Sequence, residues 1–277
     1  MTPSPIKAFV FDWAGTMVDF GSLAPVRALQ AVFAAQGLSL SEAEARADMG
    51  MAKRAHITAI LSREPLRRQW LARKGNAPSD KDVDHLFEAI GPMMLTAASD
   101  CATLIPGAAD LVKQLRDRHI RIGSGTGYGR EMMAGILPAA AAQGYAPDVI
   151  VCAGETPQGR PSPLMTWKAL VELGAWPARA CIKVDDAVVG IREGVEAGVW
   201  TIGVAASGNG TGLDFETYSA LSPVERQQRV AASAEALSAA GADFVVASVA
   251  DIERLLPELE ARITAGLRPG AVTEIRI

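Results

Sequence analysis

The chain has 277 residues, enough for one large domain or two, and 49% of them are hydrophobic while 21% are charged. This composition is typical of a globular protein and excludes a disordered chain. Its 27 basic and 31 acidic residues give a net charge of −4, so the chain as a whole attracts neither nucleic acid nor an anionic membrane surface. Any anion that it binds must be held by a local site.

The three cysteines, Cys101, Cys152 and Cys181, are far apart and form no Cys-x-x-Cys pair. We interpret them as small buried hydrophobic residues in a reducing compartment, without a disulfide framework or a zinc site. Asp12 interrupts the apolar run near the N-terminus, unlike a signal peptide, and no apolar run approaches the ~20 residues of a membrane helix. We therefore expect a cytoplasmic protein that binds neither nucleic acid nor membrane.

The first predicted element is a buried strand over residues 6–12, which ends in an aspartate. Residues 21–99 then show helical periodicity and no convincing strand. Ser41 and Glu44, three residues apart, predict a capping box at the start of one of these helices. This part of the chain is therefore expected to be entirely helical.

From about residue 100, predicted helices alternate with continuously apolar strands, which indicates a doubly wound parallel sheet covered on both faces. The helices are expected at 106–119, 129–143, 163–173, 188–198, 223–240 and 249–265. The strands are expected at 120–124, 148–153, 180–186, 199–205 and 242–248. The glycine-rich segment 207–212 is interpreted as a flexible loop that follows a strand.

The first strand belongs with the alternating part, so the chain divides into an α/β core of residues 1–20 and 100–277 and a helical insertion of residues 21–99. Ligands of open α/β sheets bind beyond the carboxyl ends of the strands. The insertion leaves the core from that edge, directly after the first strand. It is therefore placed to cover the site as a cap domain.

Four predicted strand ends carry polar groups, which should converge because parallel strands end at one edge of a sheet. These groups are Asp12, the loop after residue 124 with Thr126, Arg160 and the pair Asp185-Asp186. A carboxylate can attack phosphorus, and two neighbouring carboxylates repel unless a cation such as Mg²⁺ lies between them. Arg160, Thr126 and the N–H groups of Gly125 and Gly127 could hold phosphate oxygens. Each signal is weak alone, but together and in this order they predict a phosphoryl-transfer site.

The sequence DWAGT at residues 12–16, the GTG loop, the GRP turn around Arg160 and the acidic strand end resemble the haloacid dehalogenase superfamily. The helical insertion resembles the cap of its C1-capped branch, and the resemblance covers essentially the whole chain. It implies a Rossmann-like α/β core with an inserted α-helical cap.

Ala14 stands two residues after Asp12, where phosphatases of that superfamily carry an aspartate that protonates the leaving alkoxide. Alanine cannot do this, so the leaving group needs different help. One such case is cleavage of a C–P bond beside an aldehyde group, in which the leaving group is a carbanion. This carbanion can be stabilised if a lysine first condenses with the aldehyde to an iminium. Of the three lysines in the insertion, Lys53, Lys74 and Lys81, only Lys53 lies among apolar residues.

Met49, Lys53 and His56 are spaced to share one face of a predicted helix. A partly desolvated lysine has a lowered pKa and is a better nucleophile near neutral pH. His56 is placed to move protons for it. The alternatives are that His56 is a packed or surface histidine and that Met49 belongs to the hydrophobic core.

Three motifs resemble the phosphonoacetaldehyde hydrolase family closely: DWAGT at 12–16, MGMAKRAH at 49–56 and TGYGREMM at 126–133. The resemblance implies cleavage of the C–P bond of phosphonoacetaldehyde to acetaldehyde and phosphate, with Asp12 as the nucleophile and Lys53 as the Schiff-base lysine. It also implies a homodimer, formed through the cap.

The same resemblance implies roles for the other residues of the site. Mg²⁺ would be bound by Asp12, the carbonyl oxygen of Ala14 and Asp186. The phosphonyl oxygens would be held by Thr126, Gly127 and Arg160, and the surroundings of Lys53 would be shaped by Met49, His56 and Tyr128.

One position departs from the pattern, because Gly190 stands where some relatives have an acidic residue, while Asp185 is acidic here. We expect Asp186 to be the metal ligand and Asp185 to support it. Two other functions remain open at this point: a capped phosphatase or phosphomutase acting on a small phosphate ester, and a non-catalytic binding protein of the same fold.

Overall fold

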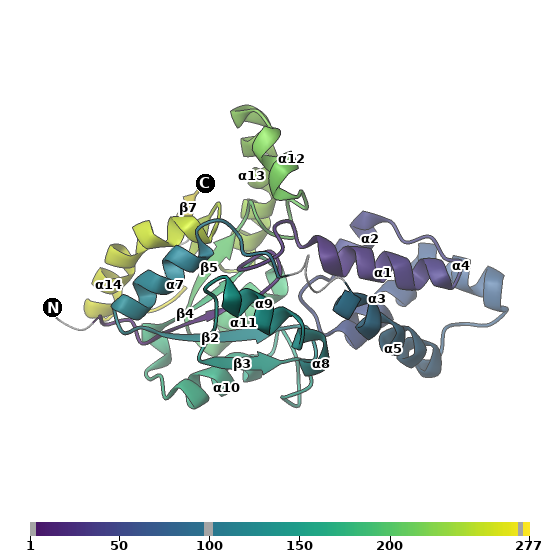
Figure 1. The fold of residues 1–277 in the computed structure, drawn as a ribbon, viewed down its shortest axis with the longest axis horizontal. Coiled ribbons are helices and arrows are strands. Elements are labelled where there is room, and N and C mark those ends of the chain that lie inside the picture. Colours follow the sequence, from purple (N-terminus) through teal and green to yellow (C-terminus); the bar gives the residue numbers. More distant parts are fainter. Residues whose placement is uncertain (1–3, 97–101, 271–273) are drawn as a thin grey trace.

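Figure 1 shows the computed structural model, which describes residues 4–96, 102–270 and 274–277. Within these ranges, seven strands form one parallel sheet in the order β3-β2-β1-β4-β5-β6-β7. The strands are β1 (Ala8–Phe11), β2 (Arg121–Thr126), β3 (Val149–Cys152), β4 (Cys181–Asp185), β5 (Trp200–Val204), β6 (Phe244–Val246) and β7 (Glu274–Arg276). The predicted doubly wound parallel sheet is confirmed.

Helices cover both faces of the sheet, which explains why its strands are continuously apolar. Phe9 and Phe11 of β1 pack toward α7, whereas Ala8 and Val10 pack toward α10 on the opposite face. The helices around the sheet are α7 (Ala108–Asp117), α8 (Arg130–Met133), α9 (Ile136–Ala142), α10 (Leu164–Leu173), α11 (Val188–Ala197), α13 (Pro223–Ala239) and α14 (Leu256–Thr264).

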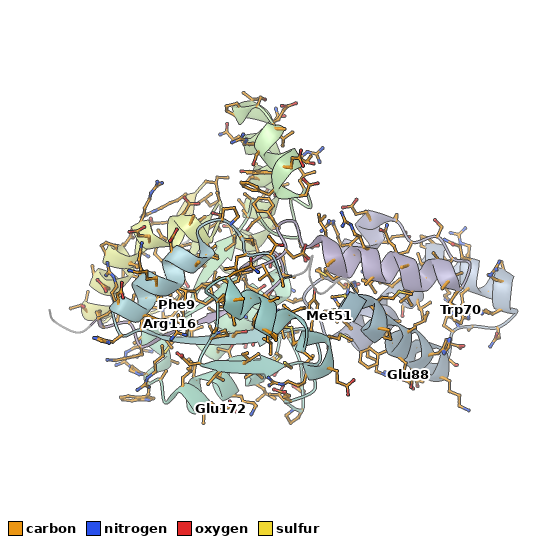
Figure 2. The ribbon with its side chains drawn as sticks, in the orientation of Figure 1. Phe9, Met51, Trp70, Glu88, Arg116 and Glu172 are labelled. Carbon is orange, nitrogen blue, oxygen red and sulfur yellow. The ribbon has the colours of Figure 1, made fainter. Side chains whose placement is uncertain are left out.

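Five helices lie beside the sheet and are called the inserted helices: α1 (Leu23–Ala35), α2 (Glu42–Arg46), α3 (Lys53–Ser62), α4 (Glu64–Lys74) and α5 (Asp80–Thr96). They pack around buried side chains that include Phe33, Ile57 and Trp70. Ser41 and Glu44 form the predicted capping box at the start of α2. Figure 2 shows Met51 where the inserted helices meet the core, and Trp70 far from that junction.

Some elements differ from the predictions. The helix predicted over 129–143 is two short helices, since the chain turns at Gly135 between α8 and α9. The helix predicted over 249–265 begins as a 3₁₀ turn, Val249–Leu255, before α14. The short helix α12 (Phe215–Ala220) and the edge strand β7 were not predicted, because α12 buries no side chain and β7 has only three residues.

Cys152 and Cys181 are buried free thiols, as predicted, whereas Cys101 lies outside the described residues. Within the residues that the structure describes, no helix has the length and apolar character needed to cross a membrane. The Met-rich stretch at the end of α5 belongs largely to the interior, because Met94 is buried and Met93 packs against the same core.

Candidate active site

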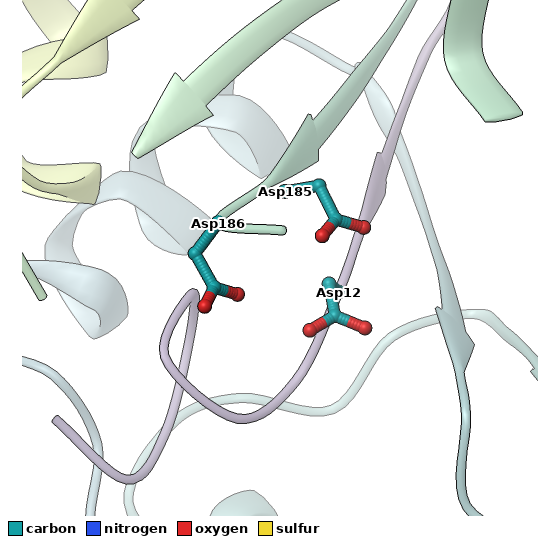
Figure 3. Close-up of side chains that lie close together, drawn as sticks. All are labelled: Asp12, Asp185 and Asp186. Atoms are coloured by element: carbon teal, nitrogen blue, oxygen red, sulfur yellow. The ribbon is translucent and has the colours of Figure 1, made fainter. Parts of the chain in front are cut away.

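The carboxylates of Asp12, Asp185 and Asp186 meet at the ends of two neighbouring strands (Figure 3). Asp12 directly follows β1 and its N–H donates to the carbonyl of Val184 in β4, at 3.0 Å. One carboxylate oxygen from each of the three aspartates lies within 4.8 Å of the others, and all three residues are buried. The predicted convergence of these strand ends is confirmed.

This arrangement concentrates negative charge where water cannot screen it. Burial raises the pKa of Asp12 to about 6, although Arg160 opposes the shift. Burial, followed by the charges of Asp12 and Asp185, raises the pKa of Asp186 well above its usual range. A further cation would relieve this repulsion, and hard carboxylate oxygens are suitable ligands for a divalent metal ion. The three aspartates could therefore hold a metal.

The carboxylate of Asp186 is held by two hydrogen bonds that the sequence did not indicate. The hydroxyl of Thr16 donates to Oδ1 at 2.9 Å, and the backbone N–H of Asn209 donates to Oδ2 at 2.7 Å. Gly15 has a φ of +84°, and a Cβ there would lie 2.4 Å from Oδ2 of Asp186. The Gly-Thr pair of the DWAGT motif is therefore explained by the close approach of this turn to Asp186.

Arg160 is buried and connects Asp12 to the opposite side of the site. Its Nη1 lies 2.8 Å from Oδ1 of Asp12, its Nε donates to Oε2 of Glu193 at 2.9 Å, and its Nη2 donates to the carbonyl of Gly125 at 2.8 Å. Gly125 lies inside β2, whereas Thr126 is its last residue and Gly127 follows it, so of the predicted phosphate-binding loop only these two line the cavity.

Lys183 is a second buried cation, which sequence analysis missed because it sits inside an apolar strand. Its Nζ lies 3.0 Å from Oδ2 of Asp185 and 3.3 Å from Oε2 of Glu193. Thr166 donates to the other oxygen of Glu193 at 2.8 Å. This cluster at the strand ends therefore carries two more carboxylates than cations, before Lys53 of the inserted helices is counted. The carboxylates are Asp12, Asp185, Asp186 and Glu193, and the cations are Arg160 and Lys183.

Gly190 is explained by the position of Asp185. A Cβ at residue 190 would lie 2.0 Å from Oδ2 of Asp185, so this carboxylate occupies the space that a side chain at 190 would need. The N–H of Ala187 donates to the other oxygen of Asp185 at 3.0 Å. The acidic residue at 185 and the glycine at 190 therefore depend on each other.

Lys53 is the first residue of α3 and only 3% of its surface is exposed. Its Nζ lies 3.7 Å from the sulfur of Met49 and 5.3 Å from the centre of the Tyr128 ring. Burial lowers the pKa of Lys53 to about 8, with Asp12 opposing this shift and Arg160 adding to it. Roughly a tenth of the amine is thus uncharged at pH 7, which is far more than for a solvated lysine.

The predicted common helix face is wrong for Met49, which precedes α3 in a turn that contains Gly50. The turn nevertheless brings Met49 beside Lys53. His56 lies one helical turn after Lys53 and is fully buried. Burial, and then the charge of Lys53, lowers the pKa of His56 to about 3, so its ring is neutral and a weak base. Lys74 and Lys81 are exposed, as expected.

The inserted helices close tightly over the strand ends. A Cβ at Gly127 would lie 2.8 Å from the carbonyl oxygen of Met51, and a Cβ at Gly50 would lie 2.7 Å from Val189 and 3.0 Å from Ala187. The cavity that remains between the inserted helices and the strand ends has a volume of about 20 Å³, which holds little more than one water molecule. Its lining comes from both parts of the chain and includes Asp12, Ala14, Met49, Lys53, Thr126, Gly127, Tyr128, Arg160 and Asp186. We therefore expect the inserted helices to move when a larger ligand binds.

Comparison with known proteins agrees with this architecture. The family model of haloacid dehalogenase-like hydrolases matches residues 6–198. A β-phosphoglucomutase from Clostridium difficile shares the fold, with a TM-score of 0.66 and 17% identity over 94% of this chain and 99% of that one. The chain belongs to the haloacid dehalogenase-like hydrolases.

Relatives with higher sequence identity show which family within this class the chain belongs to. A phosphonoacetaldehyde hydrolase from Paraburkholderia phytofirmans is 48% identical over 95% of this chain and 99% of its own length, and one from Hahella chejuensis is 43% identical over 96% and 90%. The crystal structure of a phosphonoacetaldehyde hydrolase-like protein from Oleispira antarctica superposes with a TM-score of 0.94, at 40% identity and with 96% and 97% of the two chains covered. Within this class, the chain belongs to the phosphonoacetaldehyde hydrolase family.

Gly50→Ala tests the close seating of the inserted helices. The added Cβ would collide with Val189 and Ala187, so we expect the inserted helices to pack less closely against the core. The segments that join these helices to the core should then become sensitive to limited proteolysis. Gly75→Ala is the matched control, because Gly75 also has a positive φ, +79°, but a Cβ there meets nothing within 4 Å. Equal protease resistance of the two variants would contradict the tight contact at Gly50.

Lys183→Met tests the buried ion network. The substitution removes one of the two buried cations that Asp185 and Glu193 share, the other being Arg160, so we expect the free energy of unfolding in urea to fall by about 3–5 kcal/mol. The control is Lys168→Met, which removes an exposed pair with Glu172 and should cost less than about 0.5 kcal/mol. Similar losses in the two variants would mean that the network contributes no more than a surface pair.

Proposed function

We propose that this protein hydrolyses phosphonoacetaldehyde to acetaldehyde and phosphate. One observation carries the proposal: the largely desolvated amine of Lys53 and the carboxylate of Asp12 line the same small cavity, which Ala14 also lines without an acidic group. An amine and a carboxylate in one enclosed site suit a substrate with an aldehyde at one end and phosphorus at the other. The names of the relatives support the same substrate.

The reaction proceeds through two covalent attachments. Lys53 Nζ attacks the aldehyde carbon, water leaves, and a protonated iminium joins the substrate to the lysine. A carboxylate oxygen of Asp12 then attacks phosphorus, the C–P bond breaks, and its electron pair forms the C=C bond of an enamine. The enamine takes a proton on carbon and water releases acetaldehyde from Lys53. A second water hydrolyses the aspartyl phosphate, so the net reaction consumes one water.

Ala14 is consistent with this route. The enamine leaves without needing a proton at the moment of C–P cleavage, because the C–P electron pair forms the C=C bond while the π electrons of the C=N bond move onto nitrogen. An alkoxide leaving group, by contrast, needs an acid two residues after Asp12. The absence of that acid argues against a phosphatase or phosphomutase acting on a phosphate ester. The buried Lys53 also argues against both alternatives, because neither a phosphatase nor a non-catalytic binding protein would need a buried amine beside Asp12.

We propose Mg²⁺ as the cofactor, with Asp12, the carbonyl oxygen of Ala14 and Asp186 as its protein ligands and Asp185 as a supporting residue. The surplus of buried carboxylates and their hard oxygen atoms support this choice. When bound, Mg²⁺ would balance charge on the carboxylates and on the phosphonyl group. Asp185 is already paired with Lys183, so it would support the metal site without binding the ion itself.

The remaining residues bind and orient the substrate. The phosphonyl oxygens would be held by Thr126, Gly127 and Arg160. Met49 and Tyr128 would exclude water from Lys53 and fix the position of its amine. The low pKa of His56 makes it a packing neighbour of Lys53 more readily than a carrier of protons.

The inserted helices act as the cap in this proposal. The division into a cap of residues 21–99 and a core of residues 1–20 and 100–277 is part of the proposal, and the boundary near 99 lies outside the described residues. A homodimer formed through the cap and a cytoplasmic location are proposed from the family resemblance alone.

Trapping the Lys53 adduct tests the function. With phosphonoacetaldehyde and borohydride, we expect loss of activity and a mass adduct on Lys53, because borohydride reduces an iminium to a stable amine. Lys53→Arg should lose turnover by several orders of magnitude, whereas Lys74→Arg, which changes an exposed lysine of the same helices, should retain it. Asp12→Ala should still form the adduct but release no phosphate.

Two results would contradict the proposal. Turnover retained in Lys53→Arg would exclude the covalent role of the lysine. Faster hydrolysis of simple phosphate esters than of phosphonoacetaldehyde would favour the phosphatase alternative.

The pH dependence of trapping tests the state of Lys53. Only the uncharged amine attacks the aldehyde, and burial lowers the pKa of Lys53 to about 8. The rate of adduct formation with cyanoborohydride should therefore rise with pH, level off above about 8, and fall roughly tenfold per pH unit below that value. A midpoint near the ordinary lysine pKa of about 10.4 would mean that the amine is not desolvated during the reaction.

A further inference from the structure

The glycine-rich segment after β5 is part of the site, although its sequence suggested only a flexible loop. We call residues 207–213 the glycine loop. The hydroxyl of Ser207 donates to the carbonyl of Gly15 at 2.8 Å, and the carbonyl of Ser207 accepts the N–H of Gly21 at 2.7 Å. The N–H of Asn209 donates to Asp186, as described above. The loop thus contacts the turn after Asp12 through Gly15, the start of the inserted helices through Gly21, and the predicted metal ligand Asp186.

The glycines of this loop allow its backbone to approach its neighbours closely. A Cβ at Gly208 would lie 2.4 Å from the Cβ of Asp186. Gly212 has a φ of +67°, and a Cβ there would lie 2.9 Å from the guanidinium carbon of Arg46. One end of the loop is therefore packed against Asp186 and the other against a side chain of the inserted helices.

Arg46, the last residue of α2, bridges the inserted helices and the core. Its Nη1 donates to the carbonyl of Gly21 at 2.9 Å and to Oδ1 of Asn209 at 3.1 Å, and its Nη2 donates to the carbonyl of Gly212 at 3.2 Å. The side-chain amide of Asn209 donates back to the carbonyl of Arg46 at 3.1 Å. The planar guanidinium presents several donors in a fixed geometry, which a lysine could not reproduce.

We propose that Arg46 and Asn209 are positioning residues that couple closure of the inserted helices to the placement of the Asp186 carboxylate. When the helices open, Arg46 withdraws from Asn209 and from the carbonyls of the loop. The loop is then less constrained, and the N–H that Asn209 donates to Asp186 is less well placed. The inference rests on the proposed function, because it takes Asp186 to be a ligand of Mg²⁺. The metal site is thereby complete only when the helices are closed.

Hydrogen exchange tests the coupling without metal or substrate. In Arg46→Met and in Asn209→Ala, we expect faster exchange of amides in the glycine loop, residues 207–213, while β4 and β5 stay protected. Asn209→Ala keeps the backbone N–H that bonds to Asp186, so any change reports the position of the loop. Arg54→Met is the control, because Arg54 pairs with Asp80 and Asp84 within the inserted helices. Exchange in the loop equal to that of the control in both variants would overturn the proposal.

Calorimetric titration with Mg²⁺ tests the consequence for the metal site. We expect the Kd for Mg²⁺ to rise about tenfold in each of the two variants, as is typical when a residue that orients a ligand is lost. The double variant should rise little beyond either single one, because both substitutions break the same contact. Additive effects would overturn the coupling, as would an unchanged Kd in both single variants.

The unsubstituted protein separates this inference from the proposed function. If it fails to bind Mg²⁺, the proposed cofactor is wrong, and with it the metal part of this inference. The exchange experiment then still decides whether Arg46 holds the glycine loop on Asp186. If it binds Mg²⁺ and Asp186→Asn does not, while Arg46→Met binds normally, the ligand assignment stands and the coupling is excluded.

Discussion

The constraint on which the site depends is the concentration of buried carboxylates at the ends of β1 and β4. Asp12, Asp185 and Asp186 lie within a few ångströms of one another, where water cannot screen their repulsion. Arg160 and Lys183 offset part of this charge, and Glu193 in turn holds both cations. The same charge imbalance that would destabilise an ordinary interior makes the site suitable for a divalent metal ion, whose positive charge could in turn attract a phosphonyl group.

The inserted helices also exclude water from the site, because they lie close over the strand ends. Burial lowers the pKa of Lys53 to about 8, while Asp12 limits the shift. Both effects require the helices to lie close over the strand ends, and the contacts of Gly50 and Gly127 allow this. A lysine on the same helix in an open site would be solvated, and far less of its amine would be uncharged near neutral pH.

Most of the fold was predictable because its signals are local. Apolar runs alternating with helical periodicity predicted the parallel sheet, and the strand ends then brought Asp12, Thr126, Arg160 and Asp186 together. The short edge strand β7 and the exposed helix α12 were missed, because neither has enough buried side chains to leave a periodic pattern. The helix face predicted for Met49 was wrong, because a glycine turn ends just before Lys53.

The sequence by itself determined the class of fold, the convergence of the chemical groups and the family, since motifs of consecutive residues at strand ends carry all three. Only the tertiary structure decided how those groups are held. Lys183 pairs with Asp185, Asp185 fills the space above Gly190, and Asn209 connects Asp186 to Arg46. These contacts follow from how strands and loops pack side by side, and Arg46 and Asn209 are 163 residues apart in the chain. No pattern of neighbouring residues can indicate such a pairing.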